Sequence, residues 1–157
     1  MLRLTKLTDY GILLMTHMAA ANDDTYTAAQ LAEHTHVPLP TVSKVMQMLL
    51  HQGLLESIRG AHGGYRLARP PAQISIGQII SSLEGSIALT ECNLEGSECD
   101  QLPFCTTSSH WLKINDAIRE ALEMISLEDM ARPDYRPVFR IDELRAPILI
   151  REVADGC

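Results

Sequence analysis

Several classes of protein are disfavoured by what this 157-residue sequence lacks. It contains no secretory signal peptide and no apolar run near the roughly 20 residues that a membrane-spanning helix needs. It also contains no Cys-x-x-Cys redox pair and no GxSxG, Walker or dinucleotide-binding motif. We therefore expect a cytoplasmic protein with reduced thiols that is not an enzyme. A thiol-dependent enzyme or a metal carrier is the least favoured interpretation.

Basic residues are too few for the whole chain to attract nucleic acid, because 13 Lys and Arg face 20 Asp and Glu and leave a net charge of −7. The imbalance is confined to one part of the sequence. Residues 1–70 carry six basic and five acidic groups, whereas residues 71–157 have a net charge of −8. Only the N-terminal part can therefore approach a phosphate backbone without strong repulsion.

The N-terminal part has the pattern of a helix-turn-helix. Residues 5–21 predict a first helix, and a capping box from Thr27 to Gln30 opens a short second helix. Pro40 suits the first position of a third helix, which Gly53 ends. The apolar residues of this third helix recur at steps of three and four and predict one buried stripe, formed by Val42, Val45, Met46, Leu49 and Leu50.

A β-hairpin is expected directly after the third helix. Residues 54–59 and 65–68 predict strands on either side of a glycine-rich turn at residues 60–64. The fold is then mainly α with a small β-hairpin wing, a winged helix-turn-helix, and the alternative is a generic helical domain with a solvated hairpin. We expect double-stranded DNA as partner, with the third helix in the major groove and the wing in the minor groove. The candidate DNA-binding residues are Thr41, Ser43, Lys44, Gln47, Arg59 and His62.

Three of the four cysteines, Cys92, Cys99 and Cys105, lie in one polar stretch that contains Gly and Pro. A small hydrophobic core does not need thiols there, whereas a metal ion or an iron–sulfur cluster requires such soft ligands. Zinc is less favoured, because structural zinc sites usually carry a tight Cys-x₂₋₄-Cys pair. Free thiols remain an alternative, and a disulfide among the three would leave one cysteine unpaired.

Residues 108–125 predict a long helix with an apolar stripe that runs from Trp111 to Ile125. The small winged domain cannot cover this whole stripe, so we expect the same helix of a second copy to cover it in a homodimer. The alternative is that the helix packs back on the first helix. The sequence thus divides into a winged DNA-binding domain (1–70), a cluster-binding loop with a dimerisation helix (71–130) and a mostly irregular C-terminal tail (131–157).

Three stretches resemble the Rrf family of winged-helix transcription regulators, which includes IscR and NsrR. They are Leu-Thr-Lys-Leu-Thr-Asp-Tyr-Gly at residues 4–11, the wing at residues 58–67, and the three cysteines followed by Trp111. The resemblance spans about residues 2–130 and is greatest to the regulators of SUF-type iron–sulfur assembly genes. It implies a homodimer that binds palindromic operators and holds an iron–sulfur cluster, 2Fe–2S or 4Fe–4S, on Cys92, Cys99 and Cys105.

The resemblance leaves two candidates for a fourth cluster ligand. Asp9 matches an aspartate near the start of the first helix that completes the cluster from the other subunit in NsrR-like members. His110 is the nearest histidine after the last cysteine, because Ser108 stands where IscR has its ligand histidine, and the first cysteine gap is six residues rather than the usual five. A carboxylate such as Asp9 is also favourable in a first helical turn without any ligand.

The function expected from these features is a cluster-sensing transcriptional repressor or activator of SUF-type genes. The alternatives are a cluster-free regulator of the same family that responds to a small molecule or a partner protein, and a nitric-oxide-sensing repressor.

Overall fold

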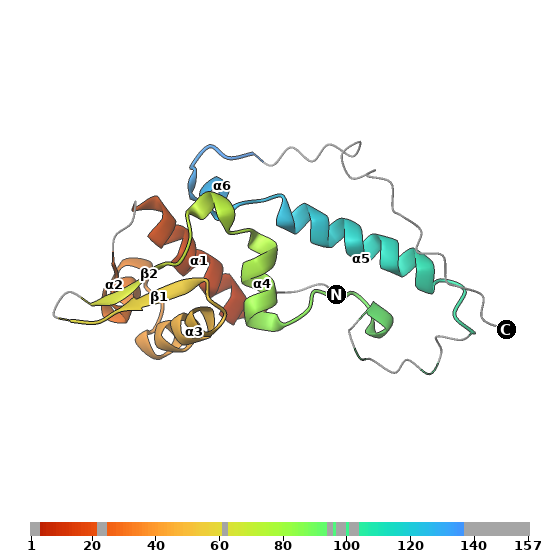
Figure 1. The fold of residues 1–157 in the computed structure, drawn as a ribbon, viewed down its shortest axis with the longest axis horizontal. Helices are drawn as coiled ribbons and strands as arrows, with labels where there is room; N and C mark the ends of the chain where they lie inside the picture. The colour runs from red at the N-terminus through yellow and green to blue at the C-terminus, as the bar shows by residue number, and fades with distance from the viewer. Residues whose placement is uncertain are drawn as a thin grey trace.

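The computed structural model describes residues 4–21, 25–60, 63–93, 96, 100 and 104–136 of the chain. Its winged part lies at one end of the molecule, and one long helix extends away from it (Figure 1). This described part is mainly helical with one two-stranded antiparallel sheet, as the sequence predicted. The elements in chain order are α1 (Lys6–Ala20), α2 (Ala28–Thr35), α3 (Leu39–His51), β1 (Leu55–Ile58), β2 (Gly64–Leu67), η1 (Pro71–Gln73), α4 (Ile76–Glu84), η2 (Glu91–Asn93), α5 (Ser108–Glu123) and α6 (Leu127–Ala131).

Local hydrogen bonds determine where the helices begin. The predicted capping box that starts at Thr27 is present at the N-terminus of α2, and a second capping box starts at Ser75 at the N-terminus of α4. The third helix begins one residue earlier than predicted, at Leu39, because the carbonyl oxygen of Pro38 already accepts helical hydrogen bonds. Pro40 is tolerated in this first turn, where a backbone N–H has no helical acceptor.

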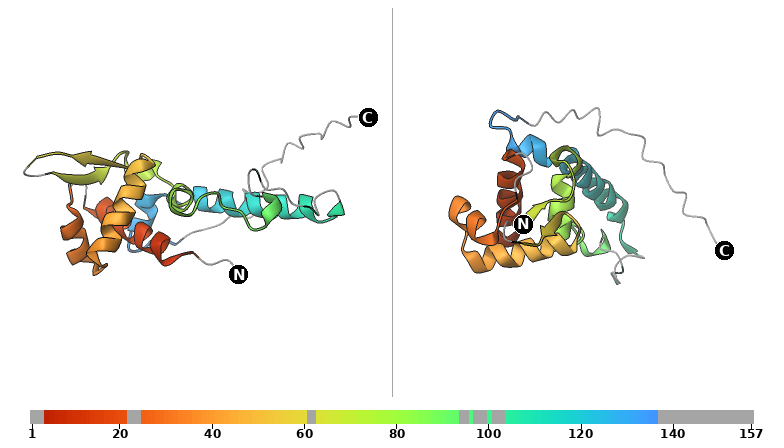
Figure 2. Two further views of the ribbon diagram at one scale, coloured as in Figure 1. Left: turned by 90° about the horizontal axis from the view of Figure 1, so that it is seen from below. Right: turned by 60° about the vertical axis from the view of Figure 1, so that its left-hand side comes forward.

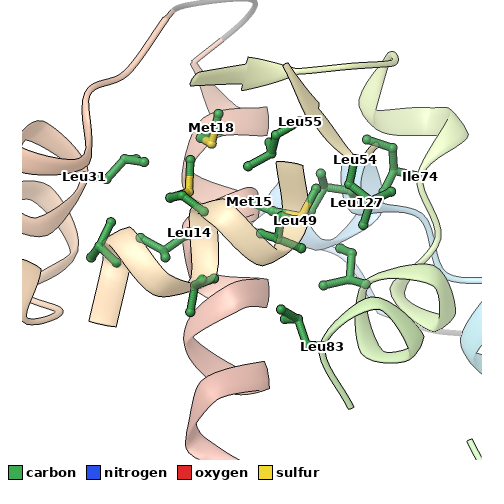
Figure 3. Close-up of a cluster of buried hydrophobic side chains, with 14 of the residues drawn as sticks. Leu14, Met15, Met18, Leu31, Leu49, Leu54, Leu55, Ile74, Leu83 and Leu127 are labelled. Atoms are coloured by element: carbon green, nitrogen blue, oxygen red, sulfur yellow. The ribbon is translucent and has the colours of Figure 1, made fainter. Parts of the chain in front are cut away.

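One hydrophobic core joins the winged part to the helices that follow it. The predicted stripe of α3 is buried in this core apart from Leu50, which is half-buried. Figure 3 shows side chains of α1 and α3, such as Leu14 and Leu49, in the same cluster as Leu83 of α4 and Leu127 of α6. The helices α1 and α4 can approach closely because α1 carries Gly11, where any added Cβ would overlap the Leu83 side chain.

A tight turn connects α3 to the wing. Gly53 has a φ of +70°, and the N–H of Leu54 donates to the carbonyl oxygen of Leu49 at 3.0 Å, which closes the C-terminus of α3 as predicted. The strands β1 and β2 then pair antiparallel along their whole length. A further bridge between Tyr26 and Tyr65 ties β2 to the chain between α1 and α2, so the wing is fixed to the helical core at its base.

The long helix α5 extends away from the winged part in two further views (Figure 2). It packs on α4 rather than on α1, and Leu122 near its C-terminus is packed against the core. In its N-terminal half, Trp111, Leu112 and Ile114 are exposed. None of the described helices is long and apolar enough to cross a membrane.

Candidate DNA interface and cysteine segment

The exposed face of α3 carries the predicted DNA-binding residues. Lys44 and Gln47 are exposed, and Thr41 and Ser43 are half-buried beside them. The stripe on the opposite face is buried in the core, which fixes the orientation of α3 about its axis. No acidic residue occurs in α3. The positive N-terminal end of the helix dipole and the Lys44 ammonium are therefore not neutralised by a carboxylate of the same helix. This face can therefore accept an anionic duplex.

The wing presents one free cation among its described residues. Arg66 is paired across the hairpin with Glu56 at 2.8 Å, so much of its charge is already compensated within the wing. Arg59 follows β1 directly, is exposed, and forms no ion pair with any residue that the structure describes. His62 lies outside the described residues. Among the described wing residues, Arg59, a candidate from the sequence, is thus the cation that is available to a DNA groove, and the pairing with Glu56 is the structural reason that Arg66 is less available.

The cysteine segment, residues 85–107, connects α4 to α5, and its described residues are 85–93, 96, 100 and 104–107. Cys92 belongs to η2, but its side chain and the whole of Cys99 lie outside the described part. Within that part no three His, Cys, Asp or Glu side chains come together as metal ligands. The set of three thiolate ligands therefore stays a prediction.

Cys105 is half-buried and lies three residues before the first residue of α5. The Oγ1 atom of Thr107 lies 3.5 Å from the Cys105 sulfur, and hydrogen bonding from Thr107 lowers the pKa of the Cys105 thiol. The Ser108 hydroxyl donates to the carbonyl oxygen of Cys105 at 3.2 Å, so the first turn of α5 also holds the cysteine backbone. A lower pKa favours the thiolate, which is the form that binds metals.

Two asparagines that the sequence analysis did not single out hold the other end of the cysteine segment. The backbone N–H of Leu89 donates to the Oδ1 atom of Asn115 in α5 at 3.0 Å. The side-chain amide of Asn93 donates to the carbonyl oxygen of Trp111 at 3.3 Å and to the hydroxyl of Thr90 at 3.0 Å. The chain around Cys92 is therefore attached to α5.

The candidate fourth ligands are both exposed. Asp9 lies in the first turn of α1, and His110 lies in the first turn of α5. At the N-cap of α1, the carboxylate of Glu84 accepts the backbone N–H of Thr5 at 2.7 Å, which joins the start of α1 to the end of α4. A hydrogen bond from the Thr8 hydroxyl is the main cause of a lowered Glu84 pKa, which favours the ionised form of this carboxylate. The start of α1 is thus connected to the point where the cysteine segment begins.

Comparison with known proteins identifies the family. Residues 4–133 match the Rrf2 family, described as an iron-dependent transcriptional regulator. The chain is 30% identical to the HTH-type transcriptional regulator NsrR of Halalkalibacterium halodurans, over 96% of this chain and 99% of the relative. Among solved structures, CymR, the global cysteine regulator of B. subtilis, is 32% identical with a TM-score of 0.67, covering 83% of this chain and 97% of that one. IscR of T. potens is 29% identical with a TM-score of 0.64, covering 90% and 96%. The chain belongs to the Rrf2 family of transcriptional regulators, and its hairpin is the wing of a winged-helix fold.

Proposed function

We propose that this protein binds operator DNA in the cytoplasm as a homodimer, with an affinity set by an iron–sulfur cluster on Cys92, Cys99 and Cys105. The observation that carries the proposal is the position of the cysteine segment. It leaves α4, which shares the core of the winged part, and enters α5. Drawing the three cysteines together therefore constrains both the DNA-binding part and α5.

The donor set fits an iron–sulfur cluster better than a hard cation. Three thiols in one polar segment are soft ligands, and the described Cys105 has an environment that favours its thiolate. When bound, the cluster supplies iron and sulfide whose loss or oxidation is the signal. Asp9 and His110 remain the candidate fourth ligands, and their exposure leaves either free to reach a group outside its own helix.

The dimer is supported by the uncovered half of α5. Trp111 is 40% exposed, Leu112 50% and Ile114 44%, although all three are large apolar side chains. A second copy of α5 would remove these side chains from water. The two winged domains of such a two-fold dimer would each bind one half of a palindromic operator. Each α3 would then place Thr41, Ser43, Lys44 and Gln47 in a major groove.

The free energy of thiolate ligation is sufficient for such a switch. Moving a two-state equilibrium from 1:99 to 99:1 requires about 5.5 kcal/mol of differential binding. Structural metal ligation in zinc fingers supplies on the order of 10 kcal/mol. Constraining the cysteine segment can therefore change the relative position of the two winged domains. The narrower proposal, that the operators control SUF-type assembly genes, is supported by the motif at residues 4–11.

Anaerobic purification followed by iron, sulfide and absorption measurements tests the cluster, with operator binding measured before and after its removal. The parent protein and a Cys157→Ala variant should both contain iron and sulfide, whereas Cys105→Ala should contain little of either. The matched variant removes a cysteine that lies outside the predicted ligand set. Asp9→Asn and His110→Ala then separate the two candidate fourth ligands by the rate at which each variant loses iron.

A second candidate function is a cluster-free regulator that responds to a small molecule. The similarity to CymR, described as a cysteine regulator, favours it. A colourless, iron-free parent protein that still binds its operator would establish this alternative in place of the cluster sensor.

A further inference from the structure

An amide, rather than an apolar side chain, occupies the most buried position of α5. Asn115 is 4% exposed, whereas Trp111, Leu112 and Ile114 in the same helix are each at least 40% exposed. Burying an amide costs free energy unless its polar atoms form hydrogen bonds. The hydrogen bond from the Leu89 N–H to the Asn115 Oδ1 atom offsets part of this cost. The presence of an asparagine at this buried position is therefore explained by its hydrogen bond to Leu89 and not by packing alone.

The second contact lies on the same face of α5. Asn115 and Trp111 are four residues apart, so the Trp111 carbonyl and the Asn115 side chain lie one helical turn from each other. Asn93 donates to that carbonyl, and Leu89 donates to that side chain. Leu89 precedes Cys92 by three residues and Asn93 follows it by one, so the two bonds bracket Cys92. In Figure 1, η2 lies beside the N-terminal half of α5.

We propose that Asn115 and Asn93 are positioning residues that hold the backbone of Cys92 on α5, where Cys92 binds the cluster. This inference rests on the proposed function. The first turn of α5 already holds Cys105, so both ends of the ligand set are positioned by the same helix. Because the two asparagines already order the backbone around Cys92, cluster binding has to order less of the chain. The same contacts couple the cluster to the position of α5.

Asn115 and Asn93 use different atoms of their side-chain amides for these hydrogen bonds. Asn115 acts as an acceptor through Oδ1. Asn93 acts as a donor through its amide nitrogen, and its own Oδ1 atom is buried without a hydrogen-bond partner among the residues that the structure describes. An Asn→Asp substitution keeps acceptors and removes donors. It should therefore preserve the acceptor for the Leu89 N–H at position 115, and at position 93 it should place a carboxylate oxygen against the Trp111 carbonyl.

The experiment compares Asn115→Asp, Asn115→Leu and Asn93→Asp in the full chain, loaded anaerobically with iron and sulfide. Loss of the cluster to a chelator is followed by absorption. Removing an outer partner of a metal ligand typically costs 10- to 100-fold in metal affinity. We expect Asn115→Leu and Asn93→Asp to lose the cluster at least about 10-fold faster than the parent, and Asn115→Asp to stay within about 3-fold of it.

A second measurement does not depend on the cluster. Hydrogen exchange of the Leu89 amide in cluster-free protein should accelerate in Asn115→Leu and remain slow in Asn115→Asp. Lys113→Leu, which adds a leucine to α5 at an exposed position, should leave both measurements unchanged.

The outcomes distinguish the two proposals. A parent protein that takes up no iron and sulfide overturns the proposed function and the role of the asparagines with it. A loaded parent whose Asn115→Leu and Asn93→Asp variants retain the cluster equally long overturns the inference about the asparagines alone.

Discussion

Replacing Lys44 by alanine should weaken DNA binding and reduce its dependence on salt. Lys44 is exposed on the α3 face opposite the core and forms no ion pair with any residue in the described part of the chain. The plot of log K against log salt has a negative slope, and each lost phosphate contact reduces the magnitude of this slope by about 0.9. At about 0.1 M salt this corresponds to about 8-fold in affinity per contact, or about 60-fold for the two copies in a dimer.

The assay is a titration of labelled operator and of unrelated duplex DNA at several salt concentrations. A phosphate contact predicts similar losses on both duplexes, because phosphates carry no sequence information. Lys113→Ala, which removes the same charge from α5, should change neither affinity nor slope. Because Lys44 is exposed, its removal should change the free energy of unfolding by less than about 0.5 kcal/mol. Unchanged affinity and slope for Lys44→Ala would refute the placement of α3 on DNA.

Three further predictions concern packing, helix capping and assembly. Gly11→Ala should reduce the free energy of unfolding by about 0.5–2 kcal/mol in urea titrations, because displacing the Leu83 side chain costs about 1–3 kcal/mol and the better helix propensity of alanine offsets up to about 1 kcal/mol of that; an unchanged or raised midpoint would contradict that close approach. Hydrogen bonds from Ser126 lower the pKa of Asp129 in the folded protein. The ionised Asp129 therefore stabilises the fold above the unfolded-state pKa of this carboxyl, and the stabilisation is lost as the pH falls through its folded-state pKa. Asp129→Asn should therefore destabilise the protein at pH 7 by about 0.5–2 kcal/mol and have little effect near pH 2, and an equal effect at both pH values would argue against a charge-dependent cap. Ile114→Asp should convert the proposed dimer to monomer in sedimentation velocity, whereas a persistent dimer would show that another surface mediates assembly.

Much of the fold could be predicted because its signals are local. A capping box such as Thr27 to Gln30 satisfies backbone donors within four residues, so it specifies a helix start wherever the rest of the chain lies. The spacing of the buried residues of α3 and the glycine at position 53 act over the same short range. The family motifs and the candidate DNA-binding residues of α3 were also visible in the sequence, because each lies within one continuous segment.

Only the tertiary structure decided which of these side chains are available and which are already engaged. The sequence named Arg59 as a candidate but gave no physical reason to exclude Arg66, whereas pairing across the hairpin gives Arg66 a carboxylate partner and leaves Arg59 without one among the described residues. Asn115 appears as an ordinary polar residue on a long helix until Leu89, 26 positions earlier, is brought against it. The physical reason is that burial and hydrogen-bond partners depend on segments distant in the chain, whereas periodicity and capping depend on neighbours.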